Sequence, residues 1–315
     1  MPVRRVKVRD RGAPSATEWI RFTSALLPRW ARRTRSLDAL LPILYLRDAW
    51  RADYERWQRR DLPARQYVYL WADGVYLQAR MEPQVECMLV LIGATPEGRK
   101  ELVGFQVGVR ESAQSWRELL VDVKVRDLAV ALRLATGDGG LGFWKALEEV
   151  FPATPHQRCW VHKAANVLDK LPKSVPPAAR QDLREIWQAP DRATAEAAME
   201  TCAEKYAAKY AKAVACLLKD REALLTFCDF PAGHWDHLRT SNPIESVFAT
   251  VRLRTVRTKG ALSQDTARLM AFKLVMAAAK TWRRLKGENQ LPKVVRGVRF
   301  RNGVEVIDAP AKTAA

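Results

Sequence analysis

Three runs of apolar residues in the first half of the chain have the length and composition of β-strands. Residues 67–72 (YVYLWA) are mostly β-formers and aromatics without a charge, which predicts a strand buried on both faces and ended by Asp73. Cys87–Thr95 and Glu101–Arg110 are two further strand-like runs, and residues 96–98 (Pro-Glu-Gly) between them indicate a hairpin turn. Three strands with short links predict an antiparallel meander.

A helical spacing of apolar residues follows: Trp116, Leu119, Leu120 and Val123. The next apolar run, Ala131–Thr136, is short and ends at GDGG (137–140), which predicts another strand. A strand reached through a helix lies parallel to an earlier strand through a right-handed crossover. If it lies beside residues 67–71, the carboxylates of Asp73 and Asp138 emerge at the same edge of the sheet.

The second half of the chain has a helical pattern. Apolar spacing predicts helices after residues 141 and 160, and the alanine-rich stretch Pro176–Asp229 predicts an all-helical insertion. Residues 240–245 (TSNPIE) open another helix, Asp265–Lys286 is a long one, and Asn302-Gly303 indicates a weak hairpin. The predicted fold class is therefore α/β, with a mixed sheet flanked by helices.

Before the first strand, residues 1–66 are basic, with a short apolar helix predicted over Leu37–Leu46 and a charged helix through Tyr54 and Trp57. These patterns divide the chain into five parts. They are a basic N-terminal region (1–66), the first part of the core (67–172), the all-helical insertion (173–238), the C-terminal helices of the core (239–287) and a tail (288–315).

Charge is the feature of the composition that bears most on function. The chain has 315 residues, of which 48% are hydrophobic, so it can bury a substantial core. Lysine and arginine total 53 against 35 acidic residues, a formal net charge of +18. This excess indicates a polyanionic partner, the alternative being a solvated basic surface.

The cysteines and the hydropathy indicate a cytoplasmic protein. Five cysteines at irregular spacing do not form a disulfide framework. The first 15 residues lack the apolar segment of a signal peptide, and no uncharged apolar run approaches the roughly 20 residues of a membrane span.

Asp73, Asp138 and Glu245 are the candidate catalytic residues. Two-metal phosphoryl transfer needs a few carboxylates that converge where Mg²⁺ ions bind, completed by substrate phosphates and water. Two aspartates at adjacent strand ends and one glutamate on a helix supply such a set.

Each of the three also has an ordinary structural explanation. Asp73 precedes Gly74 and could be a turn aspartate. Asp138 lies in GDGGLG, which superficially resembles a phosphate-binding loop, although its spacing differs and its carboxylate would repel a pyrophosphate. Glu245 would occupy the third helical position if Asn242 were the N-cap, where a capping-box glutamate belongs.

Two further sets of residues are candidates for binding. A basic run without acidic residues follows Glu245 and is suited to a phosphate backbone: Arg252, Arg254, Arg257 and Lys259. A C-x-x-H pair and an H-x-x-H pair, with His156 near the first, have ligand types and spacing suited to zinc: Cys159, His162, His234 and His237. The alternative for Cys159 is core packing, because Trp160 and Val161 follow it.

Several long motifs, in order, resemble those of bacterial insertion-sequence transposases of the mutator family. They include WADGVY, LIGATPEGRKELVGF, GDGGLGFWKALEEVFP, HQRCWVHKAANVLDKLPKSV, DREALLTFCDFPAGHWDHLRTSNPIES and FATVRLRTVRTKG, and the resemblance extends from Tyr54 to Lys286. It implies an RNase H-like catalytic domain of the DDE class, with an all-α insertion before the glutamate. The implied triad is Asp73, Asp138 and Glu245, and the motif residues are Cys159, His162 and Trp235.

The resemblance also implies a longer N-terminal region with a helix-turn-helix-like module. Residues 30–36 (WARRTRS) resemble the stretch that precedes this module, but part of it is expected to be missing between about Leu46 and Trp50.

The implied function is cleavage and transfer of DNA strands at the ends of an insertion sequence. One Mg²⁺ (or Mn²⁺) would be held by Asp73 and Asp138, and a second by Asp73 and Glu245. Double-stranded DNA is the expected partner, and Lys163 is expected to contact it together with the basic run. Because two DNA ends must be held together, a homo-oligomer is expected. The protein would be associated with the nucleoid. The alternatives are a decayed, catalytically inactive DNA-binding protein and an RNase H-like nuclease.

Overall fold

The computed structural model describes residues 48–62, 67–78, 85–108, 111–126, 132–257 and 264–307. The chain divides into two compact units, residues 1–49 and 50–315, and the fold below is that of the second. The helix predicted over Leu37–Leu46, the WARRTRS stretch and Lys259 lie outside the described residues. The charged helix through Tyr54 and Trp57 is confirmed, since residues 50–58 are helical and both aromatic side chains are buried.

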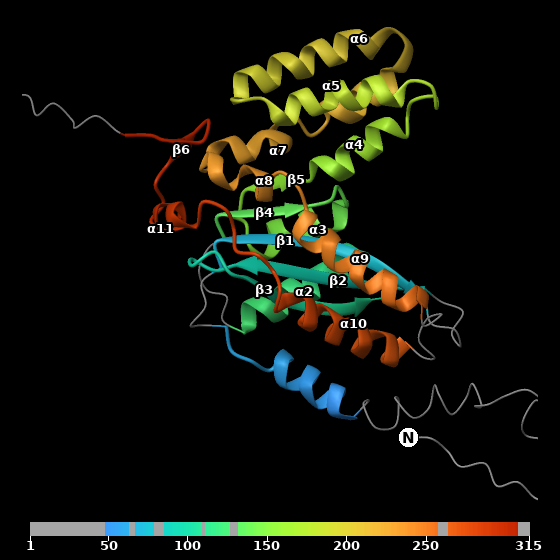
Figure 1. The fold of residues 1–315 in the computed structure, drawn as a ribbon, viewed down its shortest axis with the longest axis vertical. Coiled ribbons are helices and arrows are strands. Elements are labelled where there is room, and N and C mark those ends of the chain that lie inside the picture. The colour runs from blue at the N-terminus through green and yellow to red at the C-terminus, as the bar shows by residue number, and fades with distance from the viewer. Residues whose placement is uncertain are drawn as a thin grey trace, which may run out of the picture. The chain divides into compact units, whose positions relative to one another are not determined.

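A five-stranded sheet in the order β3-β2-β1-β4-β5 forms the centre of the unit (Figure 1). Strands β1 (Tyr69–Gln78), β2 (Val85–Ala94) and β3 (Lys100–Gly108) pair antiparallel, which confirms the predicted meander. Gly98, in the turn between β2 and β3, has a φ of 73° and donates its N–H to the Thr95 carbonyl at 2.9 Å. Glycine adopts this left-handed conformation without strain.

The other strands are parallel, as the crossover argument predicts. Helix α2 (Ala113–Val125) leads to β4 (Leu134–Gly137), which runs parallel to β1 with Ala72 opposite Gly137. Helix α3 (Leu141–Val150) then leads to β5 (His156–Arg158), which runs parallel to β4.

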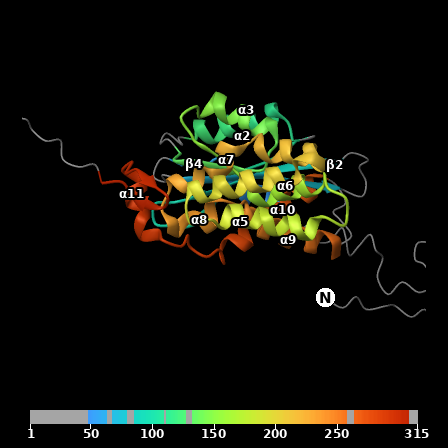
Figure 2. The same cartoon turned by 90° about the horizontal axis from the view of Figure 1, so that it is seen from above.

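The two faces of the sheet are covered by different helices (Figure 2). Side chains alternate along β1, so that Leu70 and Ala72 pack with α2 and α3 in one hydrophobic cluster. Tyr69, Trp71 and Val75 belong to the cluster on the opposite face, together with α9 (Asn242–Arg257) and α10 (Gln264–Ala279). By the same alternation, Asp73 faces α9.

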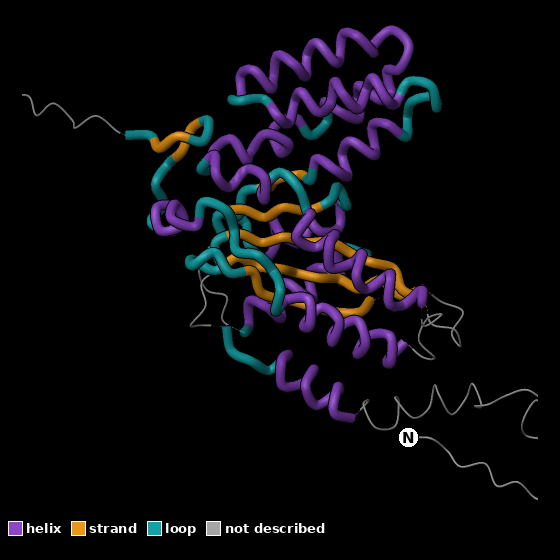
Figure 3. The backbone as a smooth tube through the Cα atoms, in the orientation of Figure 1, coloured by secondary structure: helices purple, strands orange, loops and turns teal. Residues whose placement is uncertain are grey.

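All the regular elements between residues 160 and 238 are helices joined by short turns and loops, in agreement with the alanine-rich composition (Figure 3). The segment begins with α4 (Trp160–Leu168), α5 (Pro176–Gln188) and α6 (Arg192–Leu218). It continues through α7 (Arg221–Leu225), the 3₁₀ turns η1 (Thr226–Asp229) and η2 (Ala232–His234), and α8 (Trp235–Leu238). Tyr210 interrupts α6 with non-helical angles of φ −134° and ψ 47°.

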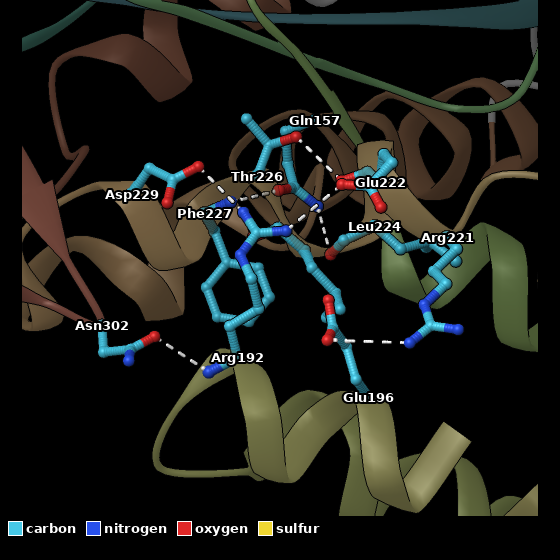
Figure 4. Close-up of polar contacts among 11 residues, drawn as sticks. Gln157, Arg192, Glu196, Arg221, Glu222, Leu224, Thr226, Phe227, Asp229 and Asn302 are labelled. Atoms are coloured by element: carbon cyan, nitrogen blue, oxygen red, sulfur yellow. Dashed lines mark hydrogen bonds and ion pairs between the residues drawn. The ribbon is translucent and has the colours of Figure 1, made fainter. Parts of the chain in front are cut away.

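Gln157, a fully buried residue of β5, forms hydrogen bonds that connect these helices to the sheet (Figure 4). Its side-chain amide donates to the Leu224 carbonyl at 3.1 Å and accepts the Phe227 N–H at 2.7 Å. Arg192, at the start of α6, pairs with Asp229 at 2.8 Å and donates its backbone N–H to Asn302 at 3.0 Å. The nitrogen and the oxygen of the Gln157 side-chain amide both form hydrogen bonds with backbone groups of α7 and η1. These bonds fix the position of α7 relative to the edge of the sheet.

The tail contains η3 (Glu288–Gln290), α11 (Leu291–Val295) and the hairpin of β6 (Phe300–Arg301) and β7 (Val304–Glu305). The predicted hairpin at Asn302-Gly303 is confirmed, and both residues have positive φ, 51° and 80°, which is typical of a type I′ turn. Helix α10 is shorter than the predicted Asp265–Lys286. Backbone N–H groups in its expected last turns bond elsewhere, Leu285 to the Gly98 carbonyl and Lys286 to the His237 ring. No helix in the described part of the chain is long and apolar enough to span a membrane.

Candidate active site

Asp73 and Asp138 lie side by side because of the register between β1 and β4. Ala72 pairs with Gly137, and each aspartate is the next residue of its chain. The prediction that Asp73 ends its strand is wrong, since β1 continues to Gln78 and Asp73 pairs with Val90 of β2. A turn aspartate is excluded for the same reason.

Asp73 is a buried carboxylate with few groups that stabilise its negative charge. It is 7% exposed, and its Oδ1 accepts the Gly74 N–H at 2.9 Å. Burial raises the pKa of Asp73 to about 7; the positive charge of His162 opposes this shift, while Asp138 and Glu111 add to it. Such a carboxylate is stabilised by a cation bound next to it.

Asp138 is held by the loop that follows β4. Its Oδ1 accepts the Gly140 N–H at 2.6 Å, and its carbonyl accepts the Trp144 indole N–H at 3.1 Å. Gly140 is the N-cap of α3. The loop amide therefore already binds a carboxylate of the chain itself, which argues against a phosphate-binding loop here.

His162 lies between the two aspartates and Glu245 and belongs to both clusters of potential metal ligands. The potential ligand atoms of Asp73, Asp138 and His162 lie within 4.8 Å of one another, and so do those of Cys159, His162 and Glu245. A hydrogen bond with Cys159 is the largest cause that raises the pKa of His162 to about 9, and the charges of the two aspartates add to it. Among the described residues, no single group of this kind contains all three catalytic candidates.

Glu245 is the fourth residue of α9, so the predicted capping box with Asn242 as N-cap is wrong. Helix α9 begins at Asn242, and the carbonyl of Ser241 accepts the N–H groups of Ile244 at 2.8 Å and Glu245 at 3.1 Å. The carboxylate of Glu245 accepts the Ser241 hydroxyl at 3.1 Å and lies 3.9 Å from His162 Nδ1. It is therefore directed toward His162.

Hydrogen bonds to the sulfur of Cys159 connect the start of α9 with the start of α4. The backbone N–H and the hydroxyl of Ser241 each lie 3.2 Å from Cys159 Sγ, and the hydroxyl lies 3.3 Å from His162 Nδ1. Cys159 is fully buried. The C-x-x-H pair thus places the helix that carries Glu245 beside the ring that contacts the aspartates.

The donor set is consistent with divalent metal ions. Asp73 supplies hard carboxylate oxygens in a buried position, Asp138 supplies them from a partly exposed one, and Glu245 supplies another across His162. Mg²⁺ and Mn²⁺ prefer such oxygen ligands together with waters and substrate phosphates.

Glu111 is a carboxylate beside the site that the sequence patterns do not identify. Its Oε1 accepts the indole N–H of the buried Trp116 at 3.0 Å. A Cβ atom added to Gly74 would lie 3.1 Å from Glu111 Oε2, and one added to Gly140 would lie 3.4 Å from Oε1. Burial, with the charge of Asp138, raises the pKa of Glu111. A glutamate just before a helix N-cap carries no signal of this proximity.

The four candidate zinc ligands do not come together in one place. His234 lies between the Tyr69 hydroxyl at 2.7 Å and the Gly287 carbonyl at 2.8 Å, and the His237 ring accepts the Lys286 N–H at 3.1 Å. Neither belongs to the groups that contain Cys159 and His162. His156 stacks on Trp144 with ring centroids 4.6 Å apart, and Trp235 donates its indole N–H to the Phe230 carbonyl at 2.8 Å.

The proposed basic contacts occupy different environments. Lys163 is 1% exposed, and its Nζ lies 2.6 Å from Asp220 Oδ2, where Arg158 also binds at 2.6 Å. The ammonium of Lys163 is thus enclosed and paired in this structure, and its contact with DNA stays a prediction that requires the Asp220 pair to open. The others lie on the second half of α9 or beyond it, and their side chains lie outside the description: Arg252, Arg254, Arg257 and Lys259.

Comparisons with known proteins identify the family. A sequence model described as "Transposase, Mutator family" matches residues 43–284. The chain is 49% identical over 254 residues to the transposase for insertion sequence element IS6120 of Mycolicibacterium smegmatis, an alignment that covers 81% of this chain and 78% of that protein. It is 46% identical over 266 residues to the transposase for IST2 of Acidithiobacillus ferrooxidans, covering 82% and 88%. The chain belongs to the mutator family of bacterial insertion-sequence transposases.

Proposed function

We propose that this chain is a DDE-class DNA transposase that cleaves and transfers the strands of an insertion sequence by metal-dependent phosphoryl transfer. The observation that carries the proposal is the pairing of Ala72 with Gly137, which brings the buried carboxylate of Asp73 next to Asp138. The names of the relatives support the same activity.

The fold supports an RNase H-like core with an all-α insertion. An antiparallel meander continues through a helix into parallel strands, and the first two proposed catalytic residues come from β1 and the end of β4. Helices α4 to α8 separate Asp138 from Glu245 in the chain, and Glu245 returns to the site on α9.

Asp73 would contact both of two Mg²⁺ or Mn²⁺ ions, Asp138 the first and Glu245 the second. When bound, such ions activate a water or 3′-hydroxyl nucleophile and stabilise the leaving oxygen. The residues of the chain position the carboxylates: Gly74 and Gly140 donate to the aspartates, and Ser241 donates to Glu245.

Double-stranded DNA is the proposed substrate, encountered at the bacterial nucleoid. A net charge of +18 favours binding to a polyanion. Helix α9 carries Glu245 in its first turn and Arg252, Arg254 and Arg257 in its second half, so a strand at the metals would run close to these cations. Because two transposon ends must be held together, the active form is proposed to be a homo-oligomer.

A strand-transfer assay on an oligonucleotide that contains an element end tests this function. We expect cleaved and joined products with Mg²⁺, none with EDTA, and none from Asp73→Asn, Asp138→Asn or Glu245→Gln, while DNA binding is retained. Asp169→Asn, a change of an exposed acid, is the matched control and should remain active. Cleavage without joining would identify a nuclease instead, and salt-dependent binding without any cleavage would identify a DNA-binding protein.

A further inference from the structure

The C-x-x-H pair has a place in the site that a mechanism of three carboxylates does not explain. A ring nitrogen of His162 lies within 4.8 Å of a carboxylate oxygen of both Asp73 and Asp138, which are themselves within that distance of each other. The three donor atoms therefore surround one small volume. A divalent ion bound there would have the imidazole within reach together with the two carboxylates.

We propose that His162 is the third protein ligand of the ion that Asp73 and Asp138 hold, so that this position binds Mn²⁺ in preference to Mg²⁺. The inference rests on the proposed function for the identity of the carboxylate site and adds a nitrogen donor to it. Imidazole suits first-row transition metals, whereas Mg²⁺ requires oxygen ligands in near-ideal octahedral geometry.

The surroundings of the ring match those of a metal-binding histidine. Such histidines usually bond through their second nitrogen to a neighbouring acceptor, which fixes the tautomer and the ring orientation. Ser241 Oγ lies 3.3 Å from His162 Nδ1, and Ser241 is itself held by Cys159. This contact leaves Nε2 as the nitrogen for the ion. Cys159 and Ser241 would then act as positioning residues for His162.

The second group, which contains Cys159, His162 and Glu245, is less suited to an ion of its own. The backbone N–H of Ser241 already donates to Cys159 Sγ, the Ser241 hydroxyl lies 3.2 Å from the same sulfur, and the sulfur belongs to a fully buried residue. The aspartate pair instead places two carboxylates next to one imidazole. Charge therefore favours the aspartate side of the ring.

Electron paramagnetic resonance of Mn²⁺ bound to the full chain without DNA tests the assignment directly. We expect electron spin echo modulation from a coordinated ¹⁴N nucleus in the unaltered protein, and its loss in His162→Asn. This variant keeps a side-chain amide near Ser241 but removes Nε2. His156→Asn, which changes a histidine stacked on Trp144 outside the site, is the matched control and should keep the signal.

Calorimetric titration with Mn²⁺ and with Mg²⁺ provides the second measurement. His162→Asn should weaken Mn²⁺ binding by about tenfold or more and Mg²⁺ binding by much less. Bound Mn²⁺ without nitrogen modulation in the unaltered protein would overturn the inference, whether or not the variant folds, while leaving the carboxylate site intact. A thiolate-to-cobalt charge-transfer band on Co²⁺ substitution would also overturn it, because His162 would then act with Cys159. If neither ion binds to the chain without DNA, the inference is overturned, and the strand-transfer assay decides the proposed function separately.

Discussion

Asp73 and Asp138 each come directly after one member of the last residue pair between β1 and β4, because Ala72 pairs with Gly137. Parallel pairing keeps successive residues of both strands in step. The sheet register therefore brings the backbones of the two aspartates together, and the loop after β4 holds the side chain of Asp138 through the Gly140 N–H. A shift of either strand would separate the two carboxylates.

Asp73→Asn should stabilise the metal-free protein at high pH. Because burial raises the pKa of Asp73 to about 7, above its ordinary value near 4, the ionised form destabilises the folded state progressively as pH rises through this window. We expect the melting temperature of the variant to exceed that of the unaltered protein by roughly 5 °C at pH 8 and by little near pH 4. Differential scanning fluorimetry across pH checks this.

Mg²⁺ provides the complementary measurement for Asp73. The ion should raise the melting temperature of the unaltered protein at pH 8, because it compensates the buried charge, and should have little effect on the variant. A difference in melting temperature that does not change with pH would show that the pKa of Asp73 is the same in the folded and unfolded states, and would contradict the raised pKa.

Much of the sheet could be predicted because its strands are continuous apolar runs. The uncharged run 67–72 belongs in a strand covered on both faces, and the helical spacing of Trp116 and Val123 specifies the crossover that makes β4 parallel. The predicted end of the strand at Asp73 is wrong, because a charged residue after an apolar run usually marks the end of a buried strand. Inside the sheet, this carboxylate is instead accommodated by the backbone of Gly74 and the ring of His162.

The connections across the site could not be predicted, because they depend on contacts between distant segments. Ser241 and Cys159 are 82 residues apart, and no local pattern relates them. Glu111 lies near the aspartates because α2 packs on the sheet at this point and the indole N–H of Trp116 in α2 donates to its carboxylate. The spacing of His234 and His237 made them candidate zinc ligands, but their rings form hydrogen bonds with Tyr69 and Lys286.

Glu111→Gln should weaken metal binding without removing a proposed ligand. Its charge helps to raise the pKa of Asp73, so the variant should have a lower Asp73 pKa in the metal-free protein. The less negative site should bind Mg²⁺ a few-fold to about tenfold more weakly. Carbon-detected NMR titration of the Asp73 carboxyl and calorimetry measure the two effects. Glu118→Gln on the exposed side of α2 is the control; an equal effect there would indicate only long-range charge.

Ser241→Ala should slow strand transfer while DNA binding is retained. The hydroxyl donates to Glu245 and contacts both Cys159 and His162, so its loss frees the glutamate and the imidazole from a shared anchor. Loss of such a supporting contact typically reduces activity or metal affinity about 10–100-fold. Single-turnover assays at saturating DNA give the rate. Ser246→Ala, a change of an exposed serine of α9, should have no such effect. A normal rate in Ser241→Ala would show that Glu245 is positioned by its helix alone.

Asp220→Asn should destabilise the protein far more than Lys163→Met. Asp220 is the carboxylate that receives both Arg158 and the buried Lys163, so its removal leaves two cations without their partner. Breaking a buried pair in this way costs about 3–5 kcal/mol. Lys163→Met keeps the Arg158 pair and fills the same apolar space, and should cost about 1 kcal/mol.

Urea unfolding measures both variants of this buried pair, and a DNA-binding titration completes the comparison. Because the ammonium of Lys163 is enclosed by the protein, Lys163→Met should bind DNA as tightly as the unaltered chain and with the same dependence on salt. Normal stability together with weaker, less salt-dependent binding would instead place Lys163 on the DNA, and would require the Asp220 contact to open when DNA is bound.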